Sequence, residues 1–219
     1  GFAIGPRLNA AGRLDDMSLG VACLMADDPA QAKSMAIRLD TLNRQRREIE
    51  ADMRADAMAH VEAMGALDTN GLPSALCLYE SHWHPGVIGI VAGRVKDRVH
   101  RPVFAFAPDG SELLKGSARS ISGVHIRDVL AAVDARHPDL IERFGGHAMA
   151  AGLSLRTAHL ERFDLAVSHE VERVVDPAAL QGGLTTDGEL QGAELGLSLA
   201  RAIRDGGPWG AAFPEPLFD

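Results

Sequence analysis

Residues 75–107 have the sequence ALCLYESHWHPGVIGIVAGRVKDRVHRPVFAFA, and this stretch decides the fold. Its first five residues, ALCLY, form a short apolar run that predicts a buried strand. The run at 86–99 is long enough for an apolar helix, and PVFAFA at 102–107 predicts a second strand. Strands separated by a helix indicate an α/β sheet domain.

The alternation of strands and helices continues beyond this stretch. After the turn signal Asp109-Gly110, the expected elements are a strand at 113–120, a helix at 126–135, a short strand at 153–155 and a helix at 158–175. We therefore expect a small mixed-sheet α/β domain at residues 72–158. Residues 159–219 are expected to be a helical and irregular linker.

A long helix is expected before this domain, at residues 28–65. Asp28 can cap it and Pro29 suits its first position, and no Gly or Pro follows until Gly65. At 1.5 Å per residue such a helix is roughly 50 Å long, longer than a small domain is wide. It either lies along one core or connects two domains, and we favour the connector. Asn70-Gly71 is the next turn signal.

The opening segment IGPRLNAAGRL, residues 4–14, predicts a loop and a tight turn, because its glycines permit unusual backbone angles. A short helix is expected at 19–25. The chain begins without Met and ends without a polar tail, so we expect it to be a piece of a longer protein.

Composition indicates an ordinary globular protein, with 46% hydrophobic and 24% charged residues. The two cysteines are too few for a disulfide framework, which favours a reducing cytoplasm. No apolar run reaches the roughly 18 residues that span a bilayer, so no membrane association is expected.

The net charge of −8 disfavours nucleic acid, but its distribution is uneven. Residues 94–127 hold seven bases and three acids, and residues 157–219 hold four bases and eleven acids. Chance scatter on solvated faces explains this pattern as well as a binding surface does.

Two segments carry candidate anion-binding chemistry. In Gly145-Gly146-His147 the glycines let backbone N–H groups approach a ligand, and the histidine adds a donor. In Ser117-Ala118-Arg119 the outer residues share one face of a strand, where a hydroxyl and a guanidinium can grip phosphate oxygens. The alternatives are a structural turn with a core histidine and an ordinary exposed strand face.

Other site motifs are missing from the sequence. There is no phosphate-binding loop, and Gly86, Gly89 and Gly93 lack the spacing of a dinucleotide fingerprint. His82 and His84 have no partner carboxylates at ligand spacing, so we expect them to be ordinary surface or structural residues. Trp83 is suited either to stacking on a base or to anchoring a domain edge.

Together these segments resemble the RecJ branch of the DHH phosphoesterase superfamily, nearly from end to end. The resemblance rests on residues 4–13, Leu42-Asn43 with Arg46 or Arg47, Trp83, residues 86–89, Arg94, residues 116–120, residues 145–152, Trp209-Gly210 and residues 214–218. Ala212 departs from the usual Asn. The resemblance implies that residues 1–27 end a catalytic DHH domain, that 72–158 form the DHH-associated domain, and that 159–219 lead to an oligonucleotide-binding barrel.

What the resemblance implies about activity is a 5′→3′ exonuclease for 5′-phosphorylated single-stranded DNA, in DNA repair and recombination, with two Mn²⁺ or Mg²⁺ ions. Because the sequence has no Asp-His dipeptide, we expect this chain to bind no catalytic metal and to be inactive alone. Ser117 and Arg119 are then expected to contact the terminal 5′-phosphate, with Arg13 nearby. His147, with the amides of Gly145 and Gly146, is expected to hold a phosphate near the scissile bond as a catalytic group.

Three alternatives stay open. One is a nano-RNase or cyclic-dinucleotide phosphodiesterase of the same superfamily, although residues 9–13 and the long helix weigh against it. Another is a non-catalytic single-strand-binding module. A relative of the alanyl-tRNA synthetase editing domain is disfavoured, because no synthetase features accompany the Gly-Gly-His segment.

Overall fold

The computed structural model describes residues 2–64, 71–183, 185–210 and 213–219. They divide into two compact units, Gly1–Gln181 and Gly182–Asp219, and each is considered by itself. The expected Asn70-Gly71 turn lies partly outside the described residues, and Gly65 and Ala212 lie outside them as well. No helix in the described ranges is long and apolar enough to cross a membrane.

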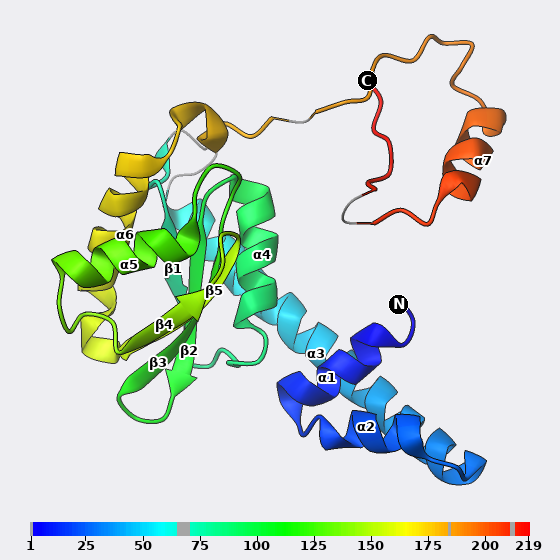
Figure 1. Cartoon of the computed structure of the whole chain (residues 1–219), viewed down its shortest axis with the longest axis horizontal. Coiled ribbons are helices and arrows are strands. Elements are labelled where there is room, and N and C mark those ends of the chain that lie inside the picture. Colours follow the sequence, from blue (N-terminus) through cyan, green and yellow to red (C-terminus); the bar gives the residue numbers. More distant parts are fainter. Residues whose placement is uncertain (1, 65–70, 184, 211–212) are drawn as a thin grey trace. The chain divides into compact units, whose positions relative to one another are not determined.

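A five-stranded mixed sheet with the order β1-β2-β3-β5-β4 forms the centre of the first unit (Figure 1). β1 pairs with β2 in parallel, and the remaining pairs are antiparallel. The strands are β1 (Leu76–Tyr79), β2 (Val103–Asp109), β3 (Leu113–Arg119), β4 (Arg143–Gly146) and β5 (Ala150–Arg156). The expected mixed α/β fold is confirmed.

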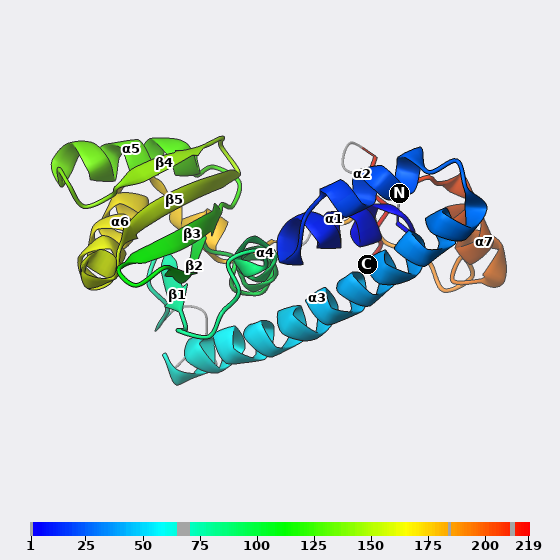
Figure 2. The same ribbon diagram turned by 90° about the horizontal axis from the view of Figure 1, so that it is seen from below.

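One face of the sheet packs against α5 (Ile126–Arg136) and α6 (Leu160–Val174), seen above and beside the sheet in Figure 2. Phe163 of α6 meets the rings of Phe104 and Phe106 edge to face, with centroids 5.5 and 5.6 Å apart. Aromatic pairs in this geometry add to the stabilisation from burial alone. The core of the domain therefore includes α6.

The other face of the sheet is covered by helices over some strands and exposed over others. Over β1 and β2 it packs against α4 (Ile88–Val99) and the second half of α3 (Pro29–Ala63), with Leu78, Ala105 and Val91 fully buried. α4 also contacts β3. Over β5 and β4 the same face carries exposed Gly152 and Gly145. We call the β3, β5 and β4 part of this face the open face.

The long helix α3 has the expected start, because the Asp28 side chain accepts a hydrogen bond from Ala30 N at 3.0 Å. It runs for 35 residues. Its contacts are with α1 (Gly5–Leu14) and α2 (Ser18–Met25) as well as with α4. Figure 2 shows that these contacts lie at different places along the helix. The long helix is therefore present, as expected.

The loop and tight turn expected at residues 4–14 were wrong, because this segment is helix α1. Pro6 fits the first turn of a helix, and Ala10 and Ala11 are fully buried. Gly12 lies against the Met17 side chain, and a Cβ at Gly12 would be 3.3 Å from Met17 Sδ. Small residues that permit close packing were mistaken for turn residues.

The strands around the Gly-Gly-His segment were also underestimated. The sequence predicts a strand only at 153–155 and leaves a structural turn at Gly145-Gly146 as an alternative, but β4 includes both glycines and β5 begins at Ala150. Glycine is disfavoured in isolated strands, and the antiparallel ladder between β4 and β5 overrides that preference. The boundary expected after residue 158 would divide a core that includes Phe163, Val167 and Val171 of α6.

The second unit contains the helix α7 (Leu197–Gly206) followed by a short folded segment. Trp209 Nε1 donates a hydrogen bond to Ile203 O at 3.0 Å. The Trp209 and Phe213 rings lie 4.7 Å apart, and Gly210 and Phe213 form an isolated bridge. Much of the region expected as linker thus has local structure of its own.

The position of α6 in the core generates a stability prediction. Phe163→Ala should lower the free energy of unfolding by about 3–5 kcal/mol, because it removes a fully buried ring. Leu165→Ala is the matched control on the same helix, since Leu165 is 75% exposed, and should change the free energy by at most about 0.5 kcal/mol. Urea denaturation of both variants measures the difference, and similar values would contradict this role of α6.

Candidate functional site

The strand register places the predicted site residues in rows across the open face. Ser117 pairs with Gly152, and Gly152 pairs with Gly145, so these residues form one row over three strands. Arg119 pairs with Ala150 in the next row. Neighbouring strands lie about 4.8 Å apart, so Gly145 and Ser117 are separated by roughly 10 Å. The two segments singled out in the sequence are therefore neighbours in space.

Ser117 and Arg119 form a joint donor group at the edge of the open face. Arg119 Nη1 donates to Ser117 Oγ at 3.0 Å and to Ala118 O at 2.8 Å. The guanidinium is half-buried, and burial, followed by the nearby charge of Arg13, lowers the pKa of Arg119. Arginine remains charged in proteins even so. An anion placed here would relieve the repulsion between the two cations.

The start of α4 lies directly under the Arg119 side chain. A Cβ built on Gly89 would lie 2.8 Å from Arg119 Nη2 and 2.9 Å from Ser117 Oγ. Gly89 is in the first turn of α4, where the backbone carries partial positive charge. Two arginines and a helix N-terminus thus direct positive potential to one place, which is the arrangement that binds a phosphate.

Arg13 reaches this place because α1 ends against the segment before α4. Its Nη1 donates to Gly86 O at 3.0 Å. A Cβ on Gly86 would lie only 2.0 Å from Arg13 O, so any side chain there would force the two backbones apart. Gly86 is therefore required for the contact between α1 and the start of α4.

The Gly-Gly-His segment continues β4 into the connection to β5. Gly146 has a φ of +149°, and a Cβ there would lie 2.5 Å from Ala150 O. The N–H of His147 donates to Ala150 O at 2.9 Å, which closes the connection. The His147 side chain is exposed, so the alternative of a core histidine is wrong.

Gly86 and Gly89 border the site, whereas the sequence offers them only as a dinucleotide fingerprint that fails on spacing and as part of the resemblance at residues 86–89. Gly152, which lies between Ser117 and Gly145, was quoted only as part of a longer segment. Gly86 lies in the turn before α4 and Gly89 in the first turn of that helix, so no single helical spacing identifies both. The close approach of other side chains to them depends on the tertiary fold.

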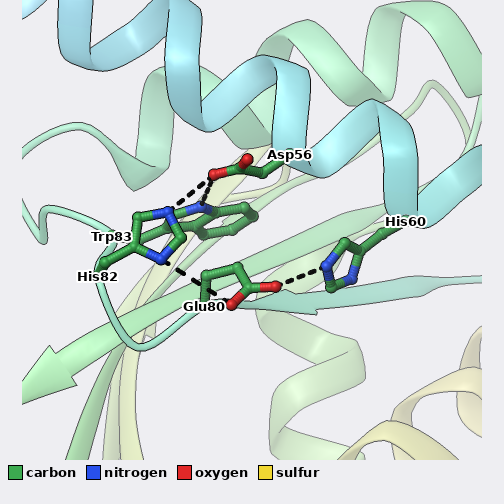
Figure 3. A network of polar contacts seen from close by, with 5 residues as sticks. All are labelled: Asp56, His60, Glu80, His82 and Trp83. Atoms are coloured by element: carbon green, nitrogen blue, oxygen red, sulfur yellow. Dashed lines mark hydrogen bonds and ion pairs between the residues drawn. The ribbon is translucent and has the colours of Figure 1, made fainter.

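A polar network attaches α3 to the loop before α4 (Figure 3). Asp56 Oδ2 accepts hydrogen bonds from Trp83 Nε1 at 3.1 Å and contacts His82 Nε2 at 2.9 Å. The Trp83 bond, then that of His82, lowers the pKa of Asp56. Glu80 contacts His60 at 2.7 Å. Trp83 is 2% exposed, so it anchors this loop and has no free face for a base.

His84 also has a local structural role. Its Nδ1 accepts a hydrogen bond from the N–H of Gly86 at 3.0 Å. No group of three or more histidine, cysteine or carboxylate side chains within the described ranges could hold a metal ion. The histidine, cysteine and carboxylate side chains of the described residues therefore do not fit a two-metal centre.

Comparisons with known proteins agree on one family. A model of the DHHA1 domain matches residues 72–174. The chain is 52% identical to the "Single-stranded-DNA-specific exonuclease RecJ" of Salmonella typhimurium and 51% identical to that of Escherichia coli. Each match covers the whole chain but only 38% of the relative, so the chain spans well under half of these proteins.

A solved structure gives the same answer for the fold. The crystal structure of RecJ from Thermus thermophilus in complex with Mg²⁺ matches with a TM-score of 0.79 and 31% identity, over 99% of this chain and 32% of that one. A second structure of the same protein contains Mn²⁺ and also gives a TM-score of 0.79. These matches show that the chain belongs to the RecJ family and contains a DHHA1 domain.

Proposed function

We propose that this chain is the substrate-binding part of a 5′→3′ exonuclease that acts on single-stranded DNA. The observation that carries the proposal is the cluster of Ser117, Arg119 and Arg13 at the first turn of α4. The cluster brings together more positive charge than a structural role needs, in a chain whose net charge is −8. A role in DNA repair and recombination in the cytoplasm fits this proposal.

The cluster suits the terminal 5′-phosphate of a strand. A terminal phosphate carries up to two negative charges and several free oxygens, whereas an internal phosphodiester carries one charge. Arg119 can offer two parallel N–H groups to such oxygens, and Ser117 Oγ lies 3.0 Å from its Nη1. A second cation, Arg13, favours the dianion further. The cluster should therefore distinguish phosphorylated 5′ ends from hydroxyl ends.

His147 and the adjacent glycines are proposed to hold the next phosphate, near the bond that is cut. The exposed imidazole stands at the end of β4, and Gly145 leaves the backbone beside it uncovered. Donors placed where charge develops can stabilise a transition state. Mg²⁺ or Mn²⁺, as in the related crystal structures, would supply the activation of water. The ions would be held by residues other than those described in this chain.

The central test restores a complete protein. When this chain replaces the matching 38% of the Salmonella typhimurium relative, the hybrid should degrade 5′-phosphorylated single strands from the 5′ end, and only with a divalent metal. The chain alone should bind the strand without cutting it. Degradation of dinucleotides only, or no activity with Mn²⁺ present, would sink the proposal.

The role of Arg119 predicts a selective loss. In the hybrid, Arg119→Ala should weaken binding of 5′-phosphorylated strands by about 10-fold or more, because a charged hydrogen bond contributes about 1.5–3 kcal/mol. Binding of 5′-hydroxyl strands should change much less. Equal losses on both substrates, measured by competition between them, would indicate a merely structural or general backbone contact.

The place of Gly89 predicts a variant that folds but binds poorly. Gly89→Ala should push the Arg119 guanidinium away from Ser117, and both neighbouring atoms belong to side chains that can move. Stability should therefore change little while affinity for a 5′-phosphorylated strand falls. Gly93→Ala is the control in the same helix, with open space around the new methyl group. It should raise stability by up to about 1 kcal/mol and leave affinity unchanged.

A further inference from the structure

A second basic group lies on the open face, away from the Ser117 and Arg119 cluster. Lys115 of β3 and Arg143 of β4 both pair with Ser154 of β5, so they flank it on the same face. Arg143 Nε donates to Ser154 Oγ at 3.2 Å. Ser154 is only 4% exposed, whereas both cations are exposed. Lys115 and Arg143 thus lie on either side of a buried serine, on the same face of the sheet.

This row borders a depression of about 250 Å³ in the open face. Its floor includes the paired glycines Gly145 and Gly152, which add no side chain to the surface. Lys115 and Arg143 stand at its sides, and Ser154 supplies a hydroxyl. An extended polymer could lie flat on such a floor, because the backbone itself is the surface there.

The charges around the depression are unbalanced. Within the described ranges, neither Lys115 nor Arg143 takes part in an ion pair. Glu142, the neighbour of Arg143 in the sequence, is bound by Arg156 at 2.8 Å. Two cations on one face without an ion-pair partner are suited to an anionic ligand.

We infer that Lys115 and Arg143 form a further phosphate subsite, for an internal phosphate of the single strand whose 5′ end binds at Ser117 and Arg119. Residues two apart on a strand are about 6.8 Å apart, so this subsite is near enough to the cluster for one strand to contact both. The inference rests on the proposed function of the Ser117 and Arg119 cluster. It adds a contact to the strand beyond the two phosphates proposed above for the Ser117 and Arg119 cluster and for His147.

The test compares ligands with one and with several phosphates. The chain is titrated with a fluorescent 5′-phosphorylated oligothymidylate and with 5′-thymidine monophosphate as competitor, over a series of salt concentrations. In the double variant Lys115→Gln with Arg143→Gln, the slope of log affinity against log salt should become shallower by roughly 0.7, the value for one phosphate on a single strand. Affinity for the mononucleotide should stay unchanged.

Controls separate this inference from the proposal beneath it. Arg162→Gln removes an exposed cation from α6, on the opposite side of the sheet, and should leave the slope as it is. Arg119→Ala should weaken both ligands. If it does, but the double variant keeps the original slope, the subsite is overturned alone. If no strand binds, or Arg119→Ala has no effect, the proposed function fails as well.

Inorganic phosphate, added at constant ionic strength, distinguishes a strand subsite from a site for free anions. For a strand subsite, phosphate should compete equally well against the oligonucleotide in the original chain and in the double variant. Competition that disappears in the double variant, with oligonucleotide affinity unchanged, would identify a free-anion site and overturn the inference. The melting temperature of the double variant should agree with that of the original chain, since Lys115 and Arg143 are exposed.

Discussion

The contact between the end of α1 and the segment before α4 is the constraint on which the site depends. The carbonyl oxygen of Arg13 lies where a Cβ of any larger residue at position 86 would be, and Arg13 Nη1 binds Gly86 O in return. This backbone contact brings a cation from the helices at the start of the chain to the end of β3, the middle strand of the sheet. The Trp83 anchor on Asp56 holds the same loop to α3 from the other side. The geometry of the Ser117, Arg119 and Arg13 cluster thus depends on contacts of α3 and of the loop before α4 that lie outside the cluster.

Holding Arg13 near Arg119 has an energetic cost that the fold alone does not explain. Two guanidinium groups repel each other, and burial of Arg119 adds to the penalty, as the lowered pKa of Arg119 indicates. Natural proteins accept such local strain chiefly where a ligand relieves it. A bound phosphate would change the sign of this interaction, because each cation would then face an anion. Relief of this repulsion would add to the affinity for phosphate that we propose for the cluster.

The sequence predicted the parts of this structure that depend on local pattern. The strand and helix periodicities at 75–107 and the Asp28-Pro29 helix start were enough to place the sheet and α3. Ser117 and Arg119 could be put on one face because side chains alternate along a strand. The predictions for residues 4–14 and for β4 were wrong because a segment rich in glycine and alanine can form either a loop or a tightly packed helix or strand. The atoms that would clash with a side chain at Gly86 or Gly89 belong to residues far away in the sequence. No local sequence pattern could predict these contacts.

The uneven covering of the sheet connects these observations. One face is filled by Phe104, Phe106 and Phe163 with their helices, so the strands have a stable core without help from the other side. The other face is packed by α4 over β1 and β2, which leaves β5 and β4 free to carry Gly145 and Gly152. Glycines in the middle of a strand weaken it, and this sheet tolerates them because its opposite face is already secured. Exposed glycines can therefore be tolerated in β5 and β4 because the opposite face of these strands is buried in the hydrophobic core.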